Sequence, residues 1–364
     1  MTATKRREPP SSSSSSSSLE QYLLLLLSDS NLPTGGFVAS SGLESWIQHG
    51  NLALTVAPPA PVPALSDSSA LPHSPPPPPP PRTRPQAEAA LLAFVAHSLH
   101  SYARLNVPLL RSAHAAVSSL VSPSSSSSLS SPAAQPPPFA PSSSGVDIAL
   151  GRVLSADALC ETMTLNHVAR RASTAQGVAL LTLYERALAP DVPEAGDAVQ
   201  QLVARYRGAI RAGQGGGKAV EGGNGHMSVA FAVLTAAVGL GLDAAVNLFL
   251  FLHARSLLSS AVRLNNVGPY VAHRLLLWDV KSLVDEAVAA TSTPLTPASP
   301  APSPALCAHE PPANDDWWDD DPAWLNAWGE DDGTGVQGGP VTTWPLGEII
   351  ASRHDQLFTR VFNS

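Results

Sequence analysis

The sequence predicts an all-α fold: a single helical bundle domain with long disordered insertions and tails. Apolar residues recur at spacings of three and four over long stretches of the chain, as one face of a helix requires. No stretch has the strict apolar–polar alternation of a half-buried strand. Pro and Ser are concentrated in separate low-complexity segments, which predicts that the breaks lie between helices rather than within them.

The low-complexity segments divide the 364-residue chain. They carry Ser runs, a Pro run, a Gly cluster and a Pro- and acid-rich stretch, and they bury too little apolar surface to offset the entropy of ordering them. We therefore expect a disordered N-terminal tail at 1–18 and one domain at 19–364. The domain is interrupted by low-complexity insertions at 57–86, 122–144, 213–225 and 292–342. What remains suits one domain of ordinary size.

The first packed elements are expected on either side of a Gly-rich turn. Leu19–Ser28 predicts a short apolar helix. Asn31–Gly36 predicts a turn, because Pro fixes one backbone angle and the glycines permit unusual ones. Phe37–His49 predicts a second helix. Its apolar face would consist of Phe37, Leu43, Trp46 and Ile47.

Three helices are expected in the middle of the chain. Ala87–Val121 is rich in Ala and Leu, and Pro108 is the one residue that could break it. Val146–Ala189 keeps helical periodicity for many turns, and Asp197–Ala212 is a further helix.

Three more helices are expected before the last insertion: Met227–Gly239, Asp243–Leu264 and Gly268–Ala290. Asp243 is a plausible N-cap of the second. Residues 244–252 are apolar nearly all round, which predicts the central helix of the bundle. A last short helix and a tail are expected over Ile349–Phe362.

A membrane span is not expected. The uncharged stretch Met227–Leu242 is shorter than the roughly 20 residues that a span needs, and it contains two glycines. We therefore predict a buried core helix there and no membrane partner.

The formal net charge of −8 comes from one insertion. Residues 307–338 hold nine carboxylates and no Lys or Arg, so the rest of the chain is close to neutral. Without a strongly basic face, a nucleic-acid partner is not expected. Cys160 and Cys307 form no CxxC pair and no disulfide framework, which predicts the reducing cytoplasm. The basic, Ser-rich N-terminus leaves an organelle transit peptide as the alternative.

The motifs of enzymes are missing from the sequence. Gly213–Lys218 resembles a phosphate loop, but Ala212 stands where its first Gly is required and Ala219 replaces Ser or Thr. No Gly-x-Ser-x-Gly surrounds Ser40. Carboxylate pairs suited to acid–base work occur only in the last insertion, where geometry could not be held. We predict that the chain is not an enzyme and binds no cofactor of its own.

Three groups of residues can each be interpreted in two ways. His226, at a helix start, is a weak candidate metal ligand, and a polar packing role is favoured; the pair His97 and His100 is weaker still. Arg170 and Arg171 are either a solvated turn or an anchor for an acidic or phosphate-bearing partner. The four tryptophans of the acidic insertion are either a docking motif or part of a plain insertion: Trp317, Trp318, Trp324 and Trp328.

Four blocks of the sequence, in order, resemble the UreF family of urease accessory proteins. Leu24–Glu44 resembles the family's opening, which reads SDS-x-x-P-x-GG-[FY] and then S-x-GLE. Asn166–Gly177 resembles its Arg-rich helix, and Gly225–Leu264 resembles its pair of buried helices. Ser352–Ser364 resembles its closing R-H-E-x-x-[YF]-[ST]-R-L-[FY]-x-S. A His that the family usually has in the first block is absent here.

The resemblance implies an all-α fold and no catalysis by this chain. UreF proteins dimerise and pair with a second accessory protein, UreD (also called UreH). The pair recruits the GTPase UreG and acts on apo-urease, so nickel and GTP would be handled by the complex.

The resemblance also implies the residues that bind partners. Phe37 and Arg360 match family positions linked to partner contact, and the tail Ser352–Ser364 could order on binding. The full set of expected partner-binding residues is Pro33, Gly35, Gly36, Phe37, Glu44, Arg170, Arg171, His354, Phe358, Arg360 and Phe362. The alternative is a generic helical adaptor that binds partners through its acidic Trp-rich insertion.

Overall fold

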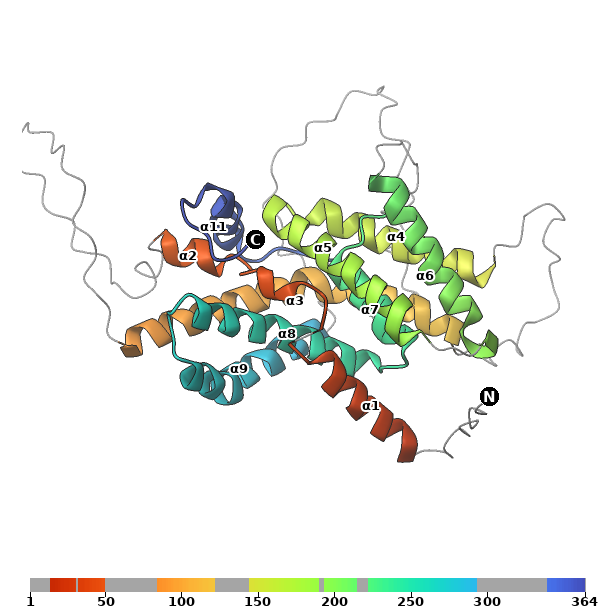
Figure 1. Cartoon of the computed structure of the whole chain (residues 1–364), viewed down its shortest axis with the longest axis horizontal. Coiled ribbons are helices and arrows are strands. Elements are labelled where there is room, and N and C mark those ends of the chain that lie inside the picture. Colours follow the sequence, from red (N-terminus) through yellow and green to blue (C-terminus); the bar gives the residue numbers. More distant parts are fainter. Residues whose placement is uncertain are drawn as a thin grey trace, which may run out of the picture.

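The computed structural model describes residues 14–30, 32–49, 84–121, 144–189, 193–214, 222–292 and 339–363. Within these ranges the secondary structure is helical, without strands, which confirms the all-α prediction. The longest helix, α3 (Arg84–Val121), runs through the middle of the molecule (Figure 1). Helices α4 (Gly145–Met163), α7 (Met227–Ala237), α8 (Leu242–Arg263) and α9 (Pro269–Ser292) all pack against it.

Helix α3 continues through Pro108 without a break. Because Pro has no N–H, the carbonyl of Arg104, one turn earlier, loses its helical donor. The backbone N–H of Val341 donates to this carbonyl at 3.3 Å. The chain that follows the last insertion therefore satisfies the group that Pro108 leaves open.

The most deeply buried helix is α7. Every residue from Ser228 to Ala236 is buried, because the helix lies between α3, α4, α5 (His167–Leu183) and α8. Helix α8 also contributes buried residues such as Phe249 to the core. Because Asn247 of α8 is exposed, α7 is closer than residues 244–252 to the central helix that was predicted.

Helix α8 is long and apolar enough to cross a membrane by length and composition alone, and it is the one such helix within the described ranges. More than half of its apolar window is buried inside the bundle, as in a core helix.

Several predicted boundaries are wrong at the ends of the insertions. Helix α1 (Ser14–Leu27) begins inside the predicted tail 1–18, and α3 begins at Arg84, inside the insertion 57–86. Ser144 caps α4 in a capping box with Asp147, so the insertion 122–144 ends one residue earlier. Helix α6 (Pro193–Gln214) includes the start of the predicted insertion 213–225. Residues 222–225, 292 and 339–342 of the predicted insertions are also described, and the other low-complexity residues lie outside the described ranges.

Two predicted helices are each divided. Phe37–His49 contains a 3-10 turn, η1 (Gly36–Val38), and a separate short helix, α2 (Leu43–Gln48). The break lies where Ser41 and Gly42 have positive φ angles of 49° and 82°. Val146–Ala189 is divided into α4 and α5, because the Asn166 side chain accepts from the N–H groups of Val168 and Ala169 and starts a new helix.

Helix α5 continues into a single π-helical turn, η3 (Tyr184–Leu188). The predicted cap at Asp243 is also wrong, since α8 begins at Leu242 after an extended Gly241 and Asp243 lies in its first turn.

The C-terminal part of the chain returns to the beginning of the fold. Helix α11 (Pro345–Ser352) lies beside α2 and is followed by the 3-10 turn η4 (Arg353–Gln356) (Figure 1). The Ser45 hydroxyl donates to the carbonyl of Ile350 at 2.5 Å. The C-terminal segment is thus packed against α2, which defines the region described next.

Candidate functional site: the turn–tail surface

The Gly-rich turn presents an aromatic side chain to solvent. Gly35 has a φ of 70°, a conformation that favours glycine, and η1 follows it directly. Phe37 is therefore not part of a core-facing helix, and 59% of its surface is exposed. The guanidinium of Arg263, at the end of α8, donates to the Phe37 carbonyl and lies 5.9 Å from the centre of its ring.

The C-terminal tail is held against this turn by one buried carboxylate. Glu44 of α2 is fully buried and accepts hydrogen bonds from the N–H groups of Val361 at 2.6 Å and Phe362 at 3.1 Å. The N–H of Asn363 donates to the carbonyl of Val38 at 2.9 Å. The tail therefore forms part of the fold before any partner is bound.

His354 contacts the tail from the buried side. Its ring is fully buried, and Nε2 lies 3.2 Å from the carbonyl oxygen of Phe362. Phe362 is 3% exposed, and the Arg263 guanidinium lies 5.5 Å from its ring centre. Three predicted partner-binding residues, Glu44, His354 and Phe362, are thus inside the chain. Their side chains position the tail instead of facing a partner.

The remaining predicted residues of this region lie on the outside. We call residues 33–38 and 358–363, together with Arg171 and Arg263, the turn–tail surface. Pro33 and Arg360 are exposed, Gly35 and Gly36 are half-buried, and Phe358 is fully exposed. An exposed Phe beside an exposed Arg is a combination that is frequent at the centres of protein interfaces.

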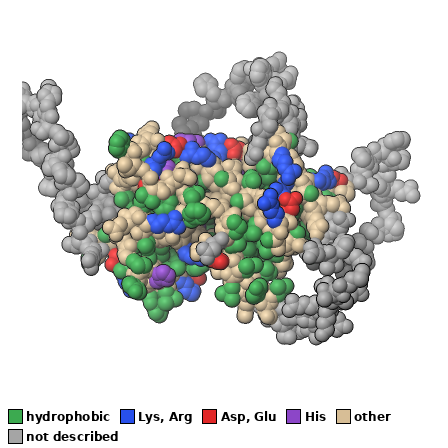
Figure 2. All heavy atoms as spheres, viewed as in Figure 1, with side chains coloured by type: hydrophobic (Ala, Val, Ile, Leu, Met, Phe, Trp, Pro, Cys, Tyr) green, Lys and Arg blue, Asp and Glu red, His purple; other side chains and the backbone are tan. Residues whose placement is uncertain are grey.

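Asp355 ties the tail to the first turns of α5. Arg171 donates to both of its oxygens, at 2.9 and 3.0 Å, and Arg360 donates at 3.2 Å. His167 Nε2 lies 3.3 Å away from the same carboxylate. The hydrogen bonds from Arg171 lower the pKa of Asp355 to about 2. Figure 2 shows charged side chains of both signs gathered where α11 and α5 adjoin.

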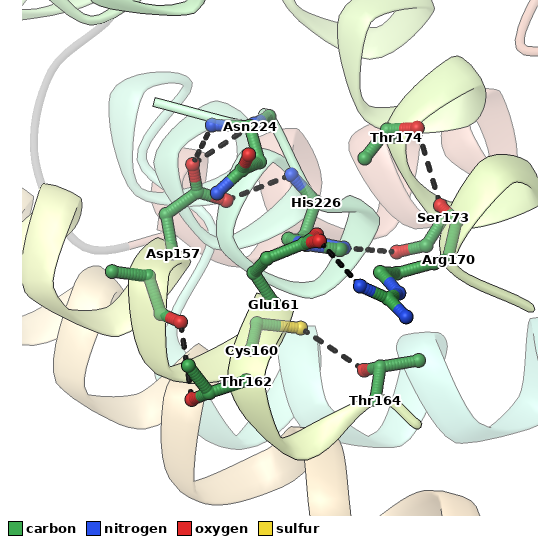
Figure 3. A network of polar contacts seen from close by, with 12 residues as sticks. Asp157, Cys160, Glu161, Thr162, Thr164, Arg170, Ser173, Thr174, Asn224 and His226 are labelled. Atoms are coloured by element: carbon green, nitrogen blue, oxygen red, sulfur yellow. Dashed lines mark hydrogen bonds and ion pairs between the residues drawn. The ribbon is translucent and has the colours of Figure 1, made fainter. Parts of the chain in front are cut away.

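Arg170 faces a second internal network (Figure 3). It donates to Glu161 at 2.8 Å, and the other oxygen of Glu161 lies 2.8 Å from His226 Nε2. Burial raises the pKa of Glu161, but the hydrogen bonds from Arg170 and His226 outweigh it and leave that pKa lowered. Arg170 and Arg171 thus both hold carboxylates of the same chain, Glu161 and Asp355.

Asp157 holds the segment that precedes α7. Its carboxylate accepts from the backbone N–H groups of Asn224, Gly225 and His226 at 2.5 to 2.9 Å (Figure 3). Gly177 of α5 lies against this segment so closely that a Cβ atom would be 2.1 Å from the Gly225 carbonyl oxygen. Residues 224 and 225 of the predicted insertion 213–225 are therefore held in the fold by hydrogen bonds.

His226 has no ring nitrogen left for a metal. Nε2 is bonded to Glu161, Nδ1 lies 3.2 Å from the Ser173 hydroxyl, and the ring is fully buried. Within the described ranges there is no group of three or more His, Cys, Asp or Glu side chains that could hold a metal ion. His97 stacks on Trp344 at 5.7 Å rather than pairing with His100.

A cavity of about 300 Å³ lies beneath the turn. His253 lines it, bonded to Ser98 and stacked on Tyr102, and burial lowers its pKa to about 3, so the ring is neutral. Glu348 also lines it, and burial raises the pKa of this carboxyl group. The cavity therefore places several polar groups under the turn, among them the hydrogen-bonded pair Ser98 and His253.

Three contributors to the site were not predicted. Asp355 stands where the family's closing block has Glu, and it joins the side chains of His167, Arg171 and Arg360. Arg263 links the turn to the tail, although 99 residues separate it from Phe362 in the sequence. Asp157 sits within a helical pattern that gives no sign of its role.

Known proteins resemble the chain over most of its length. The sequence profile of the UreF family matches residues 86–278, from α3 into α9. "Urease accessory protein 6" of Cryptococcus neoformans var. grubii is 34% identical over 353 residues, which cover 93% of this chain and 95% of that protein.

Proposed function

This chain belongs to the UreF family of urease accessory proteins, and on that premise we propose that it is a non-catalytic scaffold. Family membership gives it a role in urease maturation and in interaction with other urease accessory proteins. The proposal concerns which partners it binds and by which surface.

The proposed assembly has four components. A homodimer of this chain pairs with a UreD/UreH-type accessory protein, and together they recruit a UreG-type GTPase and apo-urease in the cytoplasm. Nickel is the cargo of this assembly and GTP is the substrate of the GTPase. Neither is assigned to a resident site in this chain.

One observation carries the assignment of the surface. Glu44 and Arg263 hold the tail on the turn, so that Phe37, Phe358 and Arg360 belong to one exposed region. A pre-ordered tail binds with a smaller loss of conformational entropy than a free one. We assign the turn–tail surface to the UreD/UreH-type partner.

The chemistry of the buried polar groups supports a scaffold rather than an enzyme. His226, Glu161 and Asp157 are bonded to one another or to the backbone. Cys160 is buried, and burial raises the pKa of its thiol to about 11, which keeps it protonated at neutral pH. The adaptor alternative relies on residues 307–338, which lie outside the described ranges.

A co-purification experiment tests the assignment. Phe358→Ala and Arg360→Ala are expected to weaken binding to the UreD/UreH-type partner at least tenfold each, about 1.4 kcal/mol. Ile148→Ala and Arg152→Ala, which change exposed side chains of α4, are the matched controls. Equal recovery of the partner with all four variants would show that the surface is wrongly assigned.

A further inference from the structure

The outer face of α9 exposes large apolar side chains. Tyr270, Leu277 and Trp278 are 91%, 58% and 73% exposed, while residues such as Leu275 and Val280 of the same helix face the core. At helical spacing these three side chains share one side of the helix. In Figure 2 hydrophobic, basic and His side chains lie together over the start of α9. An exposed Trp between exposed Tyr and Leu marks an interaction surface.

Two basic side chains lie on this face. Arg274 and Lys281 lie among the apolar residues, and each makes one surface ion pair, with Glu88 and Asp285 respectively. Their side chains are more than half exposed, and such pairs contribute little to stability. Asp279 is half-buried. The exposed acids Asp285 and Glu286 lie beyond Lys281, towards the end of the helix.

The same chain contains a segment of the complementary kind. Residues 317–328 read WWDDDPAWLNAW, with four tryptophans around three consecutive aspartates. They belong to the stretch 307–338, which has nine carboxylates and no Lys or Arg. The turn–tail surface does not use this segment, and the proposed scaffold function gives it no role.

The length of chain permits the segment to reach α9. Residues 293–316 separate Ser292 from Trp317, and a chain of this length can span up to about 80 Å when extended. Trp278 lies about 21 Å and Tyr270 about 33 Å back along the helix from Ser292. After Trp328, residues 329–340 can extend about 40 Å before Val341, which is fixed to Arg104 of α3.

We infer that residues 317–328 dock in cis on the outer face of α9. The indole rings cover Tyr270, Leu277 and Trp278, and the three aspartates face Arg274 and Lys281. Docking removes apolar surface of both partners from water, and the covalent tether keeps the local concentration of the segment high. The face is thereby assigned to a segment of this chain and not to another protein.

Photo-cross-linking of the full-length protein tests this inference. A p-benzoylphenylalanine placed at Ser282, exposed on α9, should form cross-links with peptides from 317–328 in a product of monomer mass. The same probe at Ser155, exposed on α4, is the control position. Leu277→Ala combined with Trp278→Ala should reduce the cross-linked fraction at least fivefold. Asn replacements of Asp319, Asp320 and Asp321 should reduce it by a smaller factor.

Leu277 and Trp278 are more than half exposed, and Ile148→Ala, at a side chain of similar exposure, serves as the matched apolar control. It should leave the cross-linked fraction unchanged. Cross-links to a second copy, seen as a product of dimer mass, would assign the face to self-association and overturn the inference. So would a yield at Ser282 no higher than at Ser155, or cross-links confined to other segments.

Discussion

At the scale of single residues, Glu44 is the side chain on which the tail depends. It is fully buried, and its two oxygens accept the N–H groups of consecutive tail residues. Glu44→Ala would leave both N–H groups without their acceptor and open a cavity beside α2. We expect a loss of about 2–4 kcal/mol in the free energy of unfolding, measured by urea denaturation.

The same variant should expose the tail to protease before the rest of the chain unfolds. Asp285→Asn is the control, because this exposed carboxylate makes only a surface ion pair and should change stability by less than about 0.5 kcal/mol. If Glu44→Ala were as stable as Asp285→Asn, the tail would not be held in the way described.

Asp355 predicts a pH dependence of the tail. Its pKa, lowered to about 2 by Arg171, lies below the ordinary value of about 3.9. The ion pair therefore stabilises the folded chain above pH 4, and this contribution is lost as the pH falls towards 2. Since the carboxylate is one-third exposed, solvent screening limits the effect to about 1 kcal/mol.

The comparison of wild type with Asp355→Asn measures this effect. The stability difference between the two proteins should be present in full at pH 5 and should fall to about a third of that value at pH 2.5. A difference that stayed constant over this range would contradict the ion pair as its cause.

At the scale of elements, the approach of α5 to the start of α7 requires a glycine. A Cβ at Gly177 would overlap the Gly225 carbonyl, which Asp157 holds in place from the other side. Gly177→Ala should therefore destabilise the protein by about 2–4 kcal/mol in thermal or urea unfolding.

Gly151 provides the matched comparison. It also lies inside a helix, but nothing lies within 4 Å of a Cβ placed there. Gly151→Ala should stabilise the protein by about 0.5–1 kcal/mol, because Ala favours the helix. Equal effects of the two substitutions would refute the close contact between α5 and the 222–226 segment.

Helix periodicity predicts the elements better than their ends. The long apolar pattern of 87–121 is a helix in the structure, and Pro108 is tolerated because Val341 supplies a donor from a distant segment. No local pattern contains that contact. The start of a new helix after Asn166 is predictable from the sequence, because Asn is a common N-cap before an apolar run. The break at Ser41 and Gly42 depends on α11, which packs against Gly42.

At the scale of the whole molecule, the sequence predicts which residues belong to the candidate site. It does not predict which of them are buried and which are exposed. The four family blocks contain nearly every residue of the turn–tail surface. Whether Glu44 faces a partner or the chain itself depends on how α2 meets the tail, more than 300 residues later. Family resemblance therefore identifies the region, and packing assigns the roles.

The two proposed surfaces can be tested separately. In Figure 1, α11 and α9 lie on opposite sides of α3. Substitutions on α9 should leave partner binding at the turn–tail surface unchanged, and loss of Phe358 should leave the cross-link on α9 unchanged.

Urease activation is the most direct test of the central claim. In cells that lack this chain, wild type, Ile148→Ala and Arg152→Ala should restore urease activity and the nickel content of purified urease. The double variant Phe358→Ala with Arg360→Ala should remain folded and leave urease inactive and poor in nickel. Full activation by the double variant, at wild-type protein levels, would contradict a scaffold that acts through the turn–tail surface.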